Sequence, residues 1–295
     1  MNKTWLILDC NFLCHRLKYS MGGLNYEGSP SGIIYGFLKS ITAFQELFDT
    51  PHIIFCWDSQ TNKRELVFPG YKQKRKDRVK EWTEEERVFE DEFRLQMKKL
   101  QINYLPRIGY KNIFCQEGYE SDDIIASICE KNIGIKDTAI IISSDQDLYQ
   151  CIRFNIFCYN PQKNERMTLQ RFKKKYGILP DQWHLVKAIA GCSTDEVPGV
   201  EQVGEKRAIQ YILNTIKKTT KAYQNIISKE GNKIIERNYK LVTLPLRGIN
   251  QFSLQNDRIS KEGWREVVEE LGMKSLRNKT PQSKKGVAHE KRQLI

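Results

Sequence analysis

Residues 5–9 of the chain read Trp5-Leu6-Ile7-Leu8-Asp9, a short apolar run that ends in an acid. The same order recurs at residues 53–57, which Asp58 follows, and at residues 139–142, with Asp145 close behind. Short runs of this kind, apolar at every position, are typical of strands buried on both faces of a parallel sheet. The three runs therefore predict an α/β fold with a mostly parallel sheet flanked by helices.

The segments between these runs predict helices. Residues 32–48 carry apolar side chains at helical spacing, and residues 11–20 and 121–130 also read as helices. Further strands are predicted at residues 112–115 and 156–159. Because open parallel sheets bind ligands at the carboxyl ends of their strands, the acids that follow the strands should gather at one ligand-binding edge.

The composition indicates a globular protein that acts on a polyanion. The chain has 295 residues, 40% of them apolar, which is enough for one or two domains. Its 48 basic and 36 acidic residues give a net charge of +12. A basic surface around an acidic site suits a nuclease that meets DNA or RNA, although a basic protein that merely stays soluble is the alternative.

The cysteines and the lengths of the apolar runs indicate the cellular compartment of the protein. The eight cysteines form no CxxC pair, and none of the four histidines has ligand spacing to a cysteine pair, which argues against a zinc site. No apolar run reaches membrane length, and residues 1–9 read as a strand rather than a signal peptide. We expect a cytoplasmic protein with reduced cysteines and no membrane contact.

The predicted acid cluster indicates a metal site. Carboxylates this close would repel by about 4 kcal/mol per pair at an effective dielectric of ~20, so a cation must lie among them. Oxygen ligands favour Mg²⁺, with Mn²⁺ as a substitute, and two such ions suit phosphodiester hydrolysis. Acids that merely suit a helix start at residues 120–123, or a turn at residues 145–147, are the alternative. The candidate ligands are Asp9, Asp58, Glu120, Asp122, Asp123, Asp145, Asp147 and Asp195.

A basic segment interrupts the strand and helix alternation at residues 63–80. Thr83 and Glu86 have capping-box spacing, and an amphipathic helix follows to about residue 101. A solvated charged loop would look similar. The position directly after Asp58 favours a basic flap that overhangs the metal site.

Beyond residue 160 the pattern becomes helical, with helices predicted at residues 169–176, 181–190, 205–213 and 219–228. Residues 191–206 resemble a helix-hairpin-helix, in which Gly199 and Gly204 permit a tight turn and backbone N–H groups meet phosphate. An ordinary loop is the alternative. We expect a catalytic domain at 1–165 with the flap at about 63–101, a helical DNA-binding region at 166–277 with the hairpin at about 181–213, and a disordered basic tail at 278–295.

Three motifs carry a family resemblance: Gly-Tyr-Glu-Ser-Asp-Asp at 118–123, Ser-Ser-Asp-Gln-Asp-Leu-Tyr-Gln at 143–150, and Pro-Gly-Val-Glu-Gln-Val-Gly-Glu-Lys at 198–206. Over roughly residues 4–250 the chain resembles the 5′-nuclease family, which includes bacteriophage flap endonucleases and the 5′-3′ exonuclease domain of bacterial DNA polymerase I. The resemblance implies a PIN-like fold and cleavage near the junction of a 5′ single strand with duplex DNA. A bacterial cell or a phage-infected host is then the expected setting.

The resemblance also implies residue roles. Asp9, Asp58, Glu120, Asp122 and Asp123 would serve a first metal, and Asp145, Asp147 and Asp195 a second. The basic segment resembles the base of a helical arch, where Lys72 and Arg75 would act as catalytic residues at the scissile phosphate and Tyr71 would stack on a base. Further DNA contacts are implied for Arg16, Arg64, Lys74, Gly199, Val200, Val203, Gly204 and Lys206, and a K⁺ ion on backbone carbonyls in the hairpin.

The implied substrate is DNA with a 5′ flap, a nick or a 5′ end, with an RNA primer as a further option. A monomer is expected, and a polymerase or clamp partner is left open. Two rival functions remain: a PIN-type ribonuclease without preference for a 5′ junction, and a weakly catalytic DNA-binding module. The basic arch and the hairpin favour the 5′ nuclease over the ribonuclease.

One position departs from the family pattern. Where many relatives have an aspartate directly after the glycine at 191, this chain has Cys192. Thiolate is a poor ligand for hard Mg²⁺, so the second metal should be held more weakly, and Mn²⁺ should help more than usual.

Overall fold

A sheet of six strands forms the centre of the computed structural model, which describes residues 2–281. The strand order is β5-β4-β1-β6-β7-β8, and all neighbours are parallel except β7 and β8. The predicted α/β fold is confirmed. The strands are β1 (Thr4–Asp9), β4 (His52–Trp57), β5 (Ile113–Cys115), β6 (Thr138–Ile142), β7 (Ile156–Asn160) and β8 (Glu165–Met167).

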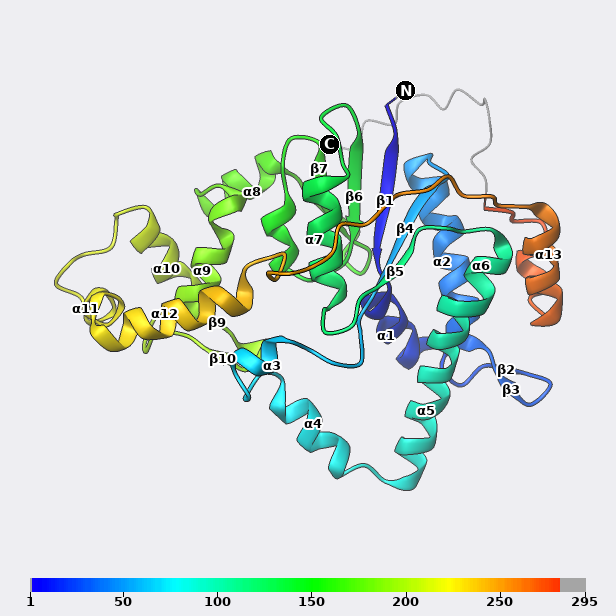
Figure 1. Cartoon of the computed structure of the whole chain (residues 1–295), viewed down its shortest axis with the longest axis horizontal. Helices are drawn as coiled ribbons and strands as arrows, with labels where there is room; N and C mark the ends of the chain where they lie inside the picture. Colours follow the sequence, from blue (N-terminus) through cyan, green and yellow to red (C-terminus); the bar gives the residue numbers. More distant parts are fainter. Residues whose placement is uncertain (1, 282–295) are drawn as a thin grey trace.

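Helices cover both faces of the sheet (Figure 1). On β1, Leu6 and Leu8 face one core, which α1 (Cys10–Met21), α2 (Gly32–Phe48) and α6 (Leu105–Ile108) complete. Trp5 and Ile7 face the other core, which is built with α7 (Ser121–Lys131). Because both faces are buried, the strands needed the apolar side chains at every position that marked them in the sequence.

The basic segment forms an arch, residues 64–99, that leaves the sheet after β4 and returns to it before β5 (Figure 1). Its helices are α3 (Arg64–Val67), α4 (Gln73–Lys80) and α5 (Glu84–Lys99). Thr83 and Glu86 form the predicted capping box at the start of α5. The helix continues as a π-helical turn, η1 (Leu100–Tyr104), into α6, where Gly109 at φ 109° ends it.

The second half of the chain is helical as predicted, but its parts lie on both faces of the sheet. The helices up to α12 extend the core that contains Trp5, while α13 packs with α6 in the core that contains Leu6. A small third cluster joins α9, the connection after it and α12 to Tyr71 of the arch. These helices are α8 (Leu169–Tyr176), α9 (Trp183–Ala190), α10 (Glu205–Ile212), α11 (Lys221–Ile227), α12 (Lys229–Val242) and α13 (Lys261–Glu270).

Short elements fill the connections. They are β2 (Asn25–Tyr26), β3 (Ser29–Pro30), η2 (Asp147–Cys151), η3 (Pro180–Gln182), β9 (Gly191–Cys192), η4 (Ser193–Asp195), β10 (Val197–Pro198) and η5 (Lys274–Leu276). None of the helices in residues 2–281 is long and apolar enough to cross a membrane. Of the predicted tail, residues 282–295 lie outside the described part of the chain.

Candidate active site

Asp9 lies at the centre of the carboxyl edge of the sheet. It ends β1 and caps α1, accepting a hydrogen bond from the Phe12 backbone N–H at 3.0 Å. The hydroxyls of Ser121 and Ser143 donate to its two oxygens at 3.2 and 2.9 Å. Burial first, and then the charge of Asp58, raise the pKa of Asp9 to about 7. The site thus holds an acid that loses its proton far less readily than a free aspartate.

Asp58 and Asp122 lie beside Asp9, from the end of β4 and the first turn of α7. Asp58 accepts from the Ser121 backbone N–H at 2.7 Å, and its own N–H donates to Asn11 at 3.0 Å. Burial, followed by the neighbouring carboxylates, raises the pKa of both acids. Among the described residues no cationic side chain pairs with Asp9, Asp58 or Asp122, which we call the sheet-side carboxylates.

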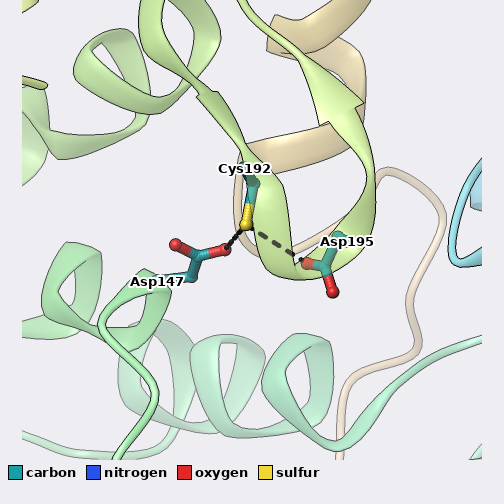
Figure 2. A group of neighbouring side chains, drawn as sticks. All are labelled: Asp147, Cys192 and Asp195. Carbon is teal, nitrogen blue, oxygen red and sulfur yellow. Dashed lines mark hydrogen bonds between the residues drawn. The ribbon is translucent and has the colours of Figure 1, made fainter. Parts of the chain in front are cut away.

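A second acidic group lines the same cleft, with Asp145 before η2, Asp147 at its start and Asp195 in η4. The backbone N–H of Asp147 donates to Asp145 at 2.8 Å, which fixes these two acids in one turn. Cys192 and Asp195 come from the connection between α9 and α10, and their side chains point toward Asp147 (Figure 2). Burial and the charge of Asp145 raise the pKa of Asp147 to about 6.

Lys187 in α9 was missed by the sequence analysis. Its side chain is only 10% exposed, and its ammonium lies 3.3 Å from Asp147 and 3.1 Å from Glu205. Both carboxylates hold the pKa of Lys187 above its usual value although burial acts to lower it. A single lysine within a helix carries no local signal, so only its place in the fold reveals it.

The arch supplies the other cations of the site. The ammonium of Lys72 contacts Glu120 and lies 3.4 Å from Asp195, and the Arg75 guanidinium lies 3.6 Å from Asp195. Burial acts to raise the pKa of Glu120, but the charges of Lys72 and Arg64, with hydrogen bonds from Lys72 and Tyr71, lower it to about 2. The base of the arch therefore already binds the acids of the cleft.

Most of the predicted acids and both predicted catalytic cations line one open cleft of about 770 Å³. Ser121, His15 and Lys187 also line it. The predicted residues that it brings together are Asp9, Asp58, Lys72, Arg75, Glu120, Asp122, Asp145, Asp147, Asp195 and, on the hairpin side, Gly204.

The predicted roles of Asp123 as a metal ligand and of Arg64 as a DNA contact are corrected by the structure. The Arg64 guanidinium donates to both oxygens of Asp123 at 2.6 and 2.8 Å, and its Nε donates to the Leu241 carbonyl at 2.8 Å. Asp123 is fully buried and Arg64 is 3% exposed. Asp123 is therefore not placed to bind a metal, and Arg64 is not placed to touch DNA, because each already satisfies the other.

Tyr71 is also corrected, because its ring is buried and its hydroxyl donates to Glu120 at 2.8 Å. Tyr71 therefore orients the Glu120 carboxylate and is not placed to stack on a base. By contrast Arg16 and Lys74 are exposed, and Lys74 places its backbone N–H on the carboxylate of Glu196.

The hairpin between α9 and α10 is only partly as predicted. Val200 and Val203 are buried, and their N–H groups donate to the Ile189 and Val200 carbonyls, so neither faces a ligand. Gly199 is needed because a Cβ there would lie 2.1 Å from the Ala190 carbonyl oxygen. Gly204 and Lys206 are exposed at the start of α10, which leaves the helix N-terminus as the accessible part.

The residues of the cleft fit divalent cations. Its carboxylates are crowded enough to raise one another's pKa, and no cationic side chain of residues 2–281 forms an ion pair with the sheet-side carboxylates. Hard carboxylate oxygens of this kind are the ligands that Mg²⁺ and Mn²⁺ prefer.

Comparison with known proteins agrees with this site. Residues 4–177 match the family model described as 5′-3′ exonuclease, N-terminal resolvase-like domain. The chain is 28% identical to a 5′-3′ exonuclease of Aquifex aeolicus over 284 residues, 93% of this chain and 94% of that one. It has the fold of the bacteriophage T5 5′-exonuclease with bound divalent metal ions (zinc). The TM-score is 0.71 and the identity 21%, over 93% of this chain and 98% of that chain. The T5 D15 flap endonuclease in complex with DNA and metal ions matches at a TM-score of 0.70 and 21% identity, over 92% of this chain and 96% of that chain.

Proposed function

Because the chain belongs to the family of 5′-3′ exonucleases with an N-terminal resolvase-like domain, we propose that it is a metal-dependent 5′ nuclease acting on structured DNA. It hydrolyses phosphodiester bonds near the junction of a 5′ single strand with a duplex, at flaps, nicks or 5′ ends. The observation that carries the proposal is the cleft itself, in which the sheet-side carboxylates, unpaired with any cationic side chain of residues 2–281, lie beside the cationic base of an arch.

The acids divide into two metal positions. The sheet-side carboxylates, with Glu120, would hold one ion, and Asp145, Asp147 and Asp195 would hold the other. Mg²⁺ is the proposed ion, and Mn²⁺ is the proposed substitute. When bound, the ions supply an activated water and neutralise charge on the phosphoryl group.

The chain's own cations position the DNA. Lys72 and Arg75 lie at the mouth of the cleft, each within 4 Å of a carboxylate oxygen of Asp195. Divalent ions on these carboxylates would weaken that hold and free both side chains for the scissile phosphate. Charged donors held at the reacting phosphate stabilise the charge that develops there. Lys72 also has a fixed backbone, at φ 52°, where the arch helix α4 begins.

The duplex would lie along the exposed start of α10. Gly204 leaves open space there, and Lys206 adds a positive charge to the helix N-terminus, which suits a phosphate oxygen. A K⁺ ion in the hairpin would share the carbonyls of Glu201 and Gln202, which already accept hydrogen bonds from Asn225 and Arg207. DNA retention in K⁺ compared with Na⁺ at equal ionic strength tests this contact.

Three further properties belong to the proposal. The protein acts as a monomer, works in the cytoplasm, and needs no membrane. An RNA primer paired to DNA would be accepted through the same phosphate contacts, since none of the proposed contacts reads a base.

Cleavage of 5′-labelled flap, nicked-duplex and single-stranded substrates, with and without Mg²⁺, tests the proposed function. Short 5′ products from the flap and the nick, formed only with metal, are the expected result. Equal cutting of single-stranded RNA would favour a PIN-type ribonuclease. DNA binding without any metal-dependent product would favour a binding module.

A further inference from the structure

Cys192 lines the cleft beside the acids and carries a soft sulfur ligand that hard-cation chemistry does not use. It is 6% exposed, and its sulfur lies 3.9 Å from Asp147 Oδ2 and 3.6 Å from Asp195 Oδ2 (Figure 2). One ligand atom from each of the three residues falls within 4.8 Å of the others. The sulfur therefore stands between two carboxylates that come from separate segments of the chain.

These spacings match a small tetrahedral site. With a metal–sulfur distance of about 2.3 Å and a metal–oxygen distance of about 2.0 Å, sulfur and oxygen ligands of a tetrahedral ion lie about 3.5 Å apart. The observed separations of 3.6 and 3.9 Å are close to that value. The two carboxylate oxygens lie within 4.8 Å of each other, so a closer approach of these two oxygens would complete the site.

Cationic side chains outside the group already orient its carboxylates. Asp147 turns Oδ1 to Lys187 at 3.3 Å and Oδ2 to the sulfur. Asp195 turns Oδ1 to Lys72 at 3.4 Å and Oδ2 to the sulfur. Each aspartate thus keeps one oxygen free toward Cys192, and outer contacts of this kind orient metal ligands. The Thr194 hydroxyl, 3.0 Å from the sulfur, fixes the thiol in the same way.

We propose that Asp147, Cys192 and Asp195 form a mixed sulfur and oxygen site that prefers Zn²⁺ to Mg²⁺, with water as the fourth ligand. The proposal rests on the proposed function, because it concerns the second metal position of the nuclease. As the metal–sulfur bond forms, the S–H bond breaks and the proton passes to solvent. The sulfur adds a soft donor that Zn²⁺ accepts and Mg²⁺ does not. Trace Zn²⁺ would then compete with Mg²⁺ at this position.

Cobalt titration of the full chain tests the site, because Co²⁺ bound to a thiolate gives a near-ultraviolet charge-transfer band. The wild type should show the band, equimolar Zn²⁺ should abolish it, and Mg²⁺ in about 100-fold excess should not. Cys192→Ser should lose the band and bind Zn²⁺ at least about tenfold more weakly. Cys115→Ser, which changes an exposed cysteine, should keep both properties.

Two results would overturn the proposal: no band in folded wild type, or an equal band in folded Cys192→Ser. If the serine variant fails to fold, Cys192→Asp replaces it, because this variant also lacks the thiolate and should lose the band. The two proposals fail separately. Cleavage without a cobalt band would refute only the zinc site, and a cobalt band without cleavage would refute only the proposed nuclease activity.

Discussion

The two sides of the acidic cleft differ in where their counter-charge comes from. The sheet-side carboxylates have no cationic partner among residues 2–281, and the pKa of each is raised. On the arch side, Glu120 is held by Lys72 and Asp123 by Arg64. The pKa of Glu120 accordingly falls to about 2. Neighbouring acids of one motif therefore differ in role: Asp122 lacks a cationic partner and is left for a metal ion, Asp123 holds the arch on the sheet, and Glu120 contacts the arch at the edge of the proposed metal position.

Asp122→Asn tests the sheet-side carboxylates and should have the largest effect. Loss of a metal ligand should reduce cleavage by about 10³-fold, since a bound metal contributes several kcal/mol to the transition state. The metal-free variant should melt at a higher temperature than the wild type, because asparagine needs neither a buried charge nor an added proton among the crowded acids. Cleavage rates and the melting temperature in chelator measure the two effects. A lower melting temperature would contradict mutual repulsion on the sheet side.

Arg64→Ala examines the arch side. It leaves the buried charge of Asp123 without a cation, held only by the backbone N–H groups of Glu120 and Leu246, so the free energy of unfolding should fall by about 3–5 kcal/mol. Urea unfolding measures the loss. Lys74→Ala, at an exposed arch position, is the matched control and should change the same quantity by less than about 0.5 kcal/mol. If the variant kept its stability but bound DNA more weakly, Arg64 would be a DNA-binding residue after all.

The pH dependence of the metal-free protein follows from Asp9. Its pKa is about 7 in the fold against the ordinary aspartate value of 3.8, so the folded state keeps a proton that the unfolded chain has lost. The free energy of unfolding should therefore fall as pH rises from about 4 to 7, by up to about 1.4 kcal/mol per pH unit. Comparison with Asp9→Asn isolates this contribution from the other groups that titrate. A constant difference between the two proteins across this range would refute it.

Lys72→Ala tests whether the arch cation serves the reaction. We expect turnover to fall about 100-fold, as for other charged donors at a reacting group. DNA affinity should change little, because many phosphate contacts share the binding. Single-turnover rates and equilibrium binding separate the two quantities. Equal losses in both would place Lys72 outside the reacting centre, and Lys74→Ala is again the control.

Cys192→Asp should have the smallest effect. A fourth carboxylate at the second position, beside Asp145, Asp147 and Asp195, should lower the Mg²⁺ concentration for half-maximal cleavage by about tenfold. The advantage of Mn²⁺ over Mg²⁺ should shrink in the same variant. Metal titrations of both proteins measure this, and identical half-saturation would remove Cys192 from the metal site.

The fold and the position of the acids were predictable because both depend on local pattern. Strands buried on both faces are apolar throughout, and the acids follow them directly. The capping box at Thr83 fixed the start of α5 in the same local way. Asp122 and Asp123 were not separable, because neighbouring residues of a helix point about 100° apart and the sequence does not say which faces the cleft.

The sequence by itself thus determined a parallel sheet, a row of acids at its carboxyl edge and a basic arch beside it. Only the tertiary structure decided which acid receives a cation. Arg64 reaches Asp123 across 59 positions, and Lys187 reaches Asp147 from another helix. It also placed Cys192 between two aspartates that no spacing along the chain connects. The reason is physical: apolar periodicity is a property of neighbours in sequence, whereas ion pairing in a buried cleft depends on which segments the folded chain brings within a few ångströms.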